Sequence, residues 1–154
     1  ALIKSMKGVN ARISYNAENK PFLSGVPGNI SISHSRNLTA ILVSYDKRVG
    51  IDLEYMSGKI SRLGHKFVNQ NEVITKNAKQ KKFHLYLHWC AKEALYKIID
   101  KQDVNFREGI TILPFEPEDN GFMRGQISNS LGKQEFDLEY LYHENYALVW
   151  CCKR

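Results

Sequence analysis

The sequence predicts an α+β fold, because strand-like segments occupy both ends of the chain and a helical stretch separates them. Residues 11–54 and the chain from residue 110 onward contain short alternating segments bounded by turn residues, whereas residues 60–99 carry apolar residues near helical spacing. The chain has 154 residues, which is enough for one globular unit with its own core. We therefore expect antiparallel strands packed on one long helix.

The first group of predicted strands ends at residue 54. A short strand is expected over residues 11–16, and a turn-rich segment with two prolines and two glycines follows at 18–28. The segments NISIS (29–33), LTAILVSY (38–45) and VGIDLE (49–54) have the composition or the alternation of strands. We expect the last three to run antiparallel and to be joined by short turns.

Two signals place helices in the middle of the chain. Asn69 with Glu72 three residues later has the form of a capping box, which predicts a helix that starts within FVNQNEVI (67–74). A longer helix is expected over residues 83–100, where four apolar residues fall near helical spacing: Leu85, Trp89, Leu95 and Ile98.

Strands return after the helices. ITILPF (110–115) and GFMRGQI (121–127) are strand candidates, and residues 134–152 predict a hairpin that turns at residues 143–145. The order of strands, helices and strands argues against a doubly wound parallel sheet.

Composition and charge restrict the class of protein. The formal net charge is +6, from 22 Lys and Arg against 16 Asp and Glu, which favours an anionic partner without naming it. Three cysteines, two of them adjacent, make a poor disulfide framework and favour a reducing, cytoplasmic location. The apolar runs are too short to span a bilayer, and no segment has the order of a signal peptide, so no membrane is expected. ALIKSMKG (1–8) has the pattern of a helix end, so the chain is expected to begin inside a larger parent.

Two carboxylates share one face of the VGIDLE strand. Asp52 and Glu54 are two residues apart, so their side chains point the same way. They repel each other unless a cation lies between them or one is protonated. Carboxylate oxygens suit Mg²⁺, although a solvated pair on an edge strand is a common alternative. The strand lies between a hydrophobic strand and a helical region, so we do not expect it to be a free edge.

A third carboxylate lies on the predicted long helix. In WCAKEALYK (89–97), Trp89, Glu93 and Lys97 share one face, and Lys92 lies beside them. A metal-bound phosphate site needs such groups, because lysines neutralise phosphate charge that one Mg²⁺ leaves uncovered. The alternative is an intrahelical Glu93–Lys97 pair worth only about 0.2–0.5 kcal/mol.

The segment SISHS (31–35), with Lys20 upstream, is a third candidate. Hydroxyls, a ring N–H and backbone amides at Ser33, His34 and Ser35 could bind a phosphate, although a turn capped by its own serines is at least as common. His84 and His88 have a spacing that could bind zinc, but no third ligand is evident, so we expect surface or half-buried helix residues. The run KNAKQKK (76–82) is expected to be a solvated helix end or loop, with a nucleic-acid patch or an acidic partner's surface as alternatives.

These motifs together resemble the 4′-phosphopantetheinyl transferase superfamily. VGID (49–52) matches its strand motif V/I-G-I/V-D, and WCAKEALYK (89–97) matches its helix motif W/F-S/T/C-x-K-E-S/A-x-x-K. FVNQNE (67–72) is similar to the family's aromatic–polar–x–x–Glu element. Because NKP (19–21) and SISHS precede VGID, the order resembles the larger, monomeric, two-half surfactin-synthetase-activator type.

The resemblance implies a pseudo-twofold architecture in which the first half is incomplete. Residues 1–47 would be the remnant of that half, with the KP and SISHS elements, and residues 48–154 would be a complete second half. Both would form one globular unit.

The resemblance also implies a reaction. The phosphopantetheine arm of coenzyme A (CoA) would move to a serine of an apo acyl or peptidyl carrier protein, releasing 3′,5′-ADP. Mg²⁺, or alternatively Mn²⁺, would be held by Asp52, Glu54 and Glu93. Catalysis would fall to Glu93 and Lys97, and CoA binding to five residues: Lys20, Ser33, His34, Lys92 and Lys97. Trp89 would pack beneath the site.

Two rival functions stay open on the sequence. A metal-dependent nuclease could use the same clustered acids with a lysine, although the E-x-K pattern that many nucleases carry on the next strand is missing. A non-catalytic module that binds CoA or a carrier protein is the other. No nucleic-acid partner is expected if the transferase reading holds.

Overall fold

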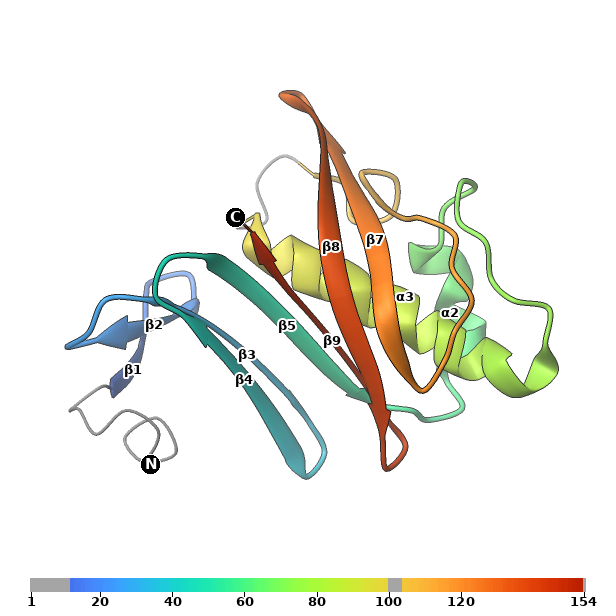
Figure 1. Ribbon diagram of the computed structural model, residues 1–154, viewed down its shortest axis with the longest axis horizontal. Coiled ribbons are helices and arrows are strands. Elements are labelled where there is room, and N and C mark those ends of the chain that lie inside the picture. The colour runs from blue at the N-terminus through green and yellow to red at the C-terminus, as the bar shows by residue number, and fades with distance from the viewer. Residues whose placement is uncertain (1–11, 100–103, 154) are drawn as a thin grey trace.

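A five-stranded antiparallel sheet forms the centre of the protein in the computed structural model, which describes residues 12–99 and 104–153 (Figure 1). Its strand order is β5-β9-β8-β7-β6. Only the first strand of this order lies beside a strand that is distant in sequence, because β5 is paired with the C-terminal strand β9. The bounds are β5 Arg48–Tyr55, β6 Ile110–Ile112, β7 Asn120–Asn129, β8 Gly132–His143 and β9 Tyr146–Lys153.

The long helix α3 (Ala78–Ile98) covers one face of this sheet and crosses behind β7 and β8 in Figure 1. Every second residue of the inner strands points at the helix. The helix contributes fully buried side chains to the same interface. The shorter helix α2 (Ile60–Phe67) packs beside α3. The centre of the core includes Leu87, Ala91, Ala94, Leu95, Leu138 and Val149.

Two hairpins precede the main sheet. One pairs β1 (Arg12–Tyr15) with β2 (Pro21–Ser24), and the other pairs β3 (Asn29–Ser35) with β4 (Leu38–Ser44). The second hairpin lies beside β5, as Figure 1 shows. A separate small core around Leu23 and Ile30 holds the two hairpins together.

The predicted α+β class and most predicted strands are confirmed. The C-terminal hairpin turns where expected, because Glu144 and Asn145 adopt positive φ angles of 44° and 67° between β8 and β9. The three cysteines are free thiols, as expected. Among the described residues, no helix is long and apolar enough to cross a membrane. The helix end expected at residues 1–8 lies outside the described residues.

Two expectations about local structure are wrong. No helix starts at Asn69; residues 70–71 form a turn, and α3 begins instead at Ala78 with Asn77 as its N-cap. β5 does not continue the β3–β4 pairing but joins β9, in a register that sets Asp52 opposite Val149. It is therefore the terminal strand of its sheet, and β3 lies along its outer edge.

Candidate functional site

Asp52 is the most constrained carboxylate of the candidate site. It lies on β5, on the face toward α3, and is 5% exposed. Its Oδ1 accepts hydrogen bonds from the Ser33 hydroxyl at 2.8 Å and from the Lys97 ammonium at 2.9 Å. Its Oδ2 is buried without a hydrogen-bond partner in the described part of the chain. A buried carboxylate oxygen left open in this way fits a site for a cation.

Lys97 joins three elements at this point. It projects from the last turn of α3, where the helix dipole favours a cation. Its ammonium donates to Asp52 Oδ1, to the backbone oxygen of Ile51 at 2.8 Å and to that of Ile32 at 3.5 Å. The sequence predicted Lys97 at the site, and the structure places it against the predicted metal ligand Asp52.

Glu54 is the member of the acidic pair whose pKa is raised. It is half-buried two residues after Asp52, and its Oε2 accepts a hydrogen bond from the Ser35 hydroxyl at 3.1 Å. Burial first and the charge of Asp52 second raise the pKa of Glu54, while hydrogen bonds from Ser35 and Trp89 and the charge of Lys97 oppose the rise. A divalent cation beside the pair would remove this repulsion.

Glu93 is brought to β5 by the crossing of α3. The backbone oxygen of Ala94, the next residue, would lie only 2.0 Å from a Cβ added at Gly50, so the helix and the strand are in direct contact there. Glu93 itself is partly buried. Within residues 12–99 and 104–153, however, no three acidic, histidine or cysteine side chains are grouped to hold a metal ion. The expected triad of Asp52, Glu54 and Glu93 is not assembled in this arrangement of side chains.

Two expected phosphate ligands lie near the hairpins. His34 is exposed on β3, next to Ser33. Lys20 is exposed immediately before β2, and burial followed by the charge of Arg48 lowers its pKa. The charge of Glu18 opposes this fall.

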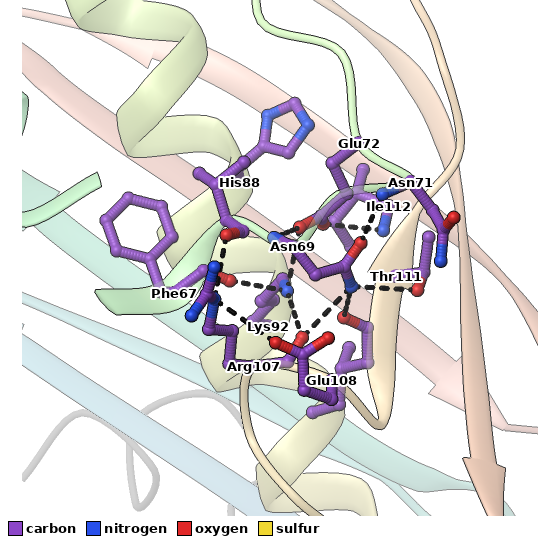
Figure 2. A network of polar contacts seen from close by, with 12 residues as sticks. Phe67, Asn69, Asn71, Glu72, His88, Lys92, Arg107, Glu108, Thr111 and Ile112 are labelled. Atoms are coloured by element: carbon purple, nitrogen blue, oxygen red, sulfur yellow. Dashed lines mark hydrogen bonds and ion pairs between the residues drawn. The ribbon is translucent and has the colours of Figure 1, made fainter. Parts of the chain in front are cut away.

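Lys92 is not at the surface, contrary to the expectation that it binds CoA phosphate. Its side chain is fully buried, and its ammonium lies 2.9 Å from Glu72 Oε2. It also donates to the backbone oxygens of Phe67 at 2.6 Å and Arg107 at 3.0 Å, as Figure 2 shows. All three protons of the ammonium are used inside the core, so Lys92 has a structural role here.

Comparison with known proteins agrees with the motifs. A model of the 4′-phosphopantetheinyl transferase superfamily matches residues 48–151, from β5 into β9. The chain belongs to this superfamily. It is also 32% identical over 120 residues to the 4′-phosphopantetheinyl transferase HetI of Nostoc sp. (strain PCC 7120 / SAG 25.82 / UTEX 2576). That alignment covers 69% of this chain and 49% of HetI, so the chain spans about half the length of this relative.

In this superfamily member, the Ser33 hydroxyl is hydrogen-bonded to other residues of the chain. Its hydroxyl donates to Asp52 and accepts the backbone N–H of Leu53 at 3.1 Å. The structure therefore shows Ser33 bound to a candidate metal ligand, whereas the sequence suggested a contact with phosphate. Trp89 packs edge-on against Phe67 and beside Phe106, with ring centroids 5.3 and 5.4 Å apart.

The sequence reasoning missed the polar network around Lys92 in this transferase-family chain. Glu72 Oε2 accepts the N–H of Asn69 at 2.7 Å, and Glu72 Oε1 accepts the N–H of Ile112 at 2.8 Å (Figure 2). The side-chain amide of Asn69 (Nδ2) donates to three oxygens: Arg107 O, Ile110 O and Thr111 Oγ1. The signal was present as FVNQNE, but it was interpreted as a helix cap.

His84 and His88 are core residues, and the expectation that they lie at or near the surface is wrong. They are 1% and 0% exposed and pack against Phe115. Burial lowers the pKa of His84 to about 4 and that of His88 to about 3. They belong to no three-residue metal group among the described residues.

Proposed function

We propose that this protein transfers the 4′-phosphopantetheine group of coenzyme A to a serine of an apo carrier protein and releases 3′,5′-ADP. The observation that carries the proposal is Asp52 Oδ2, which is buried and has no hydrogen-bond partner among the described residues, beside the half-buried Glu54 in the segment that matches the family model. The identity to HetI, named as a 4′-phosphopantetheinyl transferase, supports the same reaction.

The residues fit a divalent cation. Asp52 offers an open buried oxygen, Glu54 is destabilised as an anion by burial and then by the charge of Asp52, and Glu93 lies on α3 next to Ala94, which contacts β5. Mg²⁺, or Mn²⁺ in its place, would be held by these three carboxylates and would neutralise charge on the CoA diphosphate. Contact of the α3 backbone at Ala94, one residue from Glu93 along the helix, with Gly50 of β5 supports a place for Glu93 in this set.

The protein's own groups account for the proton and the phosphate charge. Glu93 accepts the proton of the carrier serine, whose oxygen forms a bond to phosphorus as the bond from phosphorus to 3′,5′-ADP breaks. Lys97, already fixed beside Asp52, stabilises charge on the transferred group and on the leaving phosphate. His34 on β3 and Lys20 just before β2 are the groups that we propose to bind the phosphates of CoA, and the exposure of both supports this. Lys92 is left out of this set because its ammonium is buried and fully bonded.

The partner that we propose is an acyl or peptidyl carrier protein with an acidic surface. The net charge of +6 favours such a partner electrostatically. The exposed lysines at the start of α3, Lys76, Lys79, Lys81 and Lys82, add positive charge at the positive end of the helix dipole. We propose that the protein acts in the cytoplasm as a monomer.

Transfer can be measured directly by mass spectrometry. The protein is incubated with CoA, Mg²⁺ and several apo carrier proteins, and we expect one carrier to gain the mass of a phosphopantetheine group. Glu93→Gln and Asp52→Asn should abolish the gain, because each removes one charged oxygen donor with little change in volume. A carrier whose acceptor serine is replaced by alanine is the control for the site of attachment.

The same experiment identifies the main competing function. If calorimetry shows that the protein binds CoA but no carrier gains mass, it is a binding module and the proposed transfer is wrong. If Asp52→Asn retains full activity, the assignment of Asp52 to the metal is wrong even though transfer occurs.

A further inference from the structure

The outer edge of β5 is closed by side chains rather than by another strand. β5 ends its sheet, so the N–H groups that point away from β9 have no strand to bond. Three of them donate instead to serine hydroxyls of β3. Ile51 N bonds Ser31 at 3.1 Å, Leu53 N bonds Ser33 at 3.1 Å, and Tyr55 N bonds Ser35 at 3.0 Å.

These three serines, which we call the serine ladder (Ser31, Ser33 and Ser35), occupy every second position of β3. Side chains at alternate positions of a strand point the same way, so all three hydroxyls face the edge of β5. The separation in sequence is 20 residues for each bond, so the two strands keep one register along the whole contact. The ladder thereby fixes β3 against the strand that carries the acidic pair.

Two rungs of the ladder also bind the carboxylates. A serine hydroxyl has one proton to donate, and accepting a backbone N–H leaves that proton free. Ser33 donates it to Asp52 Oδ1 at 2.8 Å, and Ser35 donates it to Glu54 Oε2 at 3.1 Å. In both cases the carboxylate belongs to the residue just before the one whose N–H is bound. Ser31 binds the N–H of Ile51, and the residue before Ile51 is Gly50, which has no carboxylate.

We propose that Ser33 and Ser35 are positioning residues that hold Asp52 and Glu54 in the orientation needed to bind the divalent cation. The cation itself rests on the proposed function. Together with Lys97, Ser33 occupies Asp52 Oδ1 and leaves the buried Oδ2 as the open ligand atom. Groups that orient metal ligands in this way typically change metal affinity by about 10–100-fold when removed.

The ladder supplies its own matched control. Ser33→Ala removes a backbone contact and a carboxylate contact, whereas Ser31→Ala removes only the backbone contact. Ser33→Thr keeps the hydroxyl and tolerates the strand conformation. Ser35→Ala tests the second carboxylate, at the less buried end of the ladder.

The test is Mn²⁺ binding to each variant in the presence of CoA, measured by electron paramagnetic resonance, with thermal melting as the check on folding. We expect Ser33→Ala to weaken Mn²⁺ binding by about 10–100-fold and Ser35→Ala to weaken it in the same direction. Ser31→Ala and Ser33→Thr should bind Mn²⁺ as the wild type does. If Ser33→Ala fails to fold, Ser35→Ala carries the test.

The outcomes separate the two proposals. Wild-type Mn²⁺ affinity in folded Ser33→Ala and Ser35→Ala would overturn the positioning role and leave the proposed transferase intact. Equal weakening in Ser31→Ala and Ser33→Ala would also overturn it, because the docking of β3 would then explain both. A wild-type protein that binds no Mn²⁺ with CoA present would overturn the metal-dependent function, and the positioning role with it.

Discussion

Gly50 sets how closely the strand with the acidic pair approaches the long helix. A Cβ at this position would lie 2.0 Å from the backbone oxygen of Ala94 and 3.0 Å from Ile98 Cγ1. The first of these contacts is with backbone, which cannot rotate away. The absence of a side chain therefore lets β5 touch α3, and this contact sets the distance between the strand that carries Asp52 and the helix that carries Glu93.

Replacement of Gly50 by alanine should separate the strand from the helix. We expect Gly50→Ala to lower the free energy of unfolding by at least about 1–3 kcal/mol, the usual range for overpacking a core. Transfer activity should fall further than stability does, because the carboxylates move apart. Chemical denaturation and the carrier mass assay measure the two effects.

Gly58→Ala is the matched control, since a Cβ there meets no atom within 4 Å. It should change stability by no more than about 0.5 kcal/mol. If Gly50→Ala and Gly58→Ala were equally stable and active, the close contact of β5 with α3 would have no functional role.

At the scale of single residues, the sequence predicted side-chain positions where the spacing of a strand or a helix determines them. Asp52 and Glu54 could be placed on one face because strand side chains alternate, and Lys97 could be placed near them because it follows Glu93 by one helical turn. Lys92 was misassigned because it lies beside Glu93 and Lys97 in the helix motif, although adjacent helical residues do not share a face. Leu95, three residues later and buried, was the available signal that Lys92 faces the core.

The loop between α2 and α3 is held by a charged pair in the core. Glu72, from the loop, binds Lys92 of α3 and the N–H of Ile112 in β6, so one carboxylate joins three parts of the chain. Burial raises the pKa of Glu72 and lowers that of Lys92, while their mutual attraction opposes both shifts. The two charges stabilise each other only as a pair.

Removing one member of the pair should therefore be costly. We expect Lys92→Met to destabilise the protein by about 3–5 kcal/mol, because Glu72 is left as an uncompensated buried charge. In the double variant Lys92→Met/Glu72→Gln the loss should be smaller than the sum of the two single losses. Urea denaturation of the four proteins forms the double-mutant cycle.

The surface pair Arg124–Glu135 is the control for this cycle. Its atoms are 3.9 Å apart, and both side chains are more than half exposed. Its coupling energy should be about 0–1 kcal/mol. A coupling for Lys92 and Glu72 as small as that of the surface pair would contradict a structural role for the buried one.

At the level of elements, the capping-box signal at Asn69 shows what a local pattern can and cannot predict. The hydrogen bond that defines the box is present, since the Glu72 carboxylate accepts the N–H of Asn69. The helix is absent because the Asn69 side-chain amide and Glu72 also bind β6 and α3, which holds residues 69–72 in a single turn. Those partners come from segments about 20 to 40 residues away, so no local pattern could reveal them.

At the level of the whole molecule, the pairing of β5 with β9 was also beyond local prediction. Alternation predicted both strands, but the register that sets Asp52 opposite Val149 joins positions almost 100 residues apart. The expectation that β5 is not a free edge was right for an unforeseen reason, because the serine ladder rather than a strand closes the edge. The order of elements was predictable, and their neighbours in space were not.

Two buried histidines should make the stability of the whole protein depend on pH. The Thr75 N–H donates to His84 Nδ1, and His88 Nδ1–H donates to the backbone oxygen of His84, so both rings are bound in the neutral form. The Nε2 atoms of both are buried without partners among the described residues. The folded protein consequently resists protonation, and the pKa values lie at about 4 and about 3 instead of 6.5.

Protonation of the unfolded chain then favours unfolding below pH 6.5. The histidine contribution to stability should be complete above that pH and should fall by about 1.4 kcal/mol per pH unit for each histidine as the pH drops toward the folded pKa values. His88→Phe removes one of the two titrations and should roughly halve this slope between pH 6.5 and pH 5. His143→Phe, at an exposed position, is the control for replacing a histidine outside the core. Urea denaturation across this pH range measures the slope, and a wild-type stability that is flat over it would show that the two rings are accessible to protons in the folded protein.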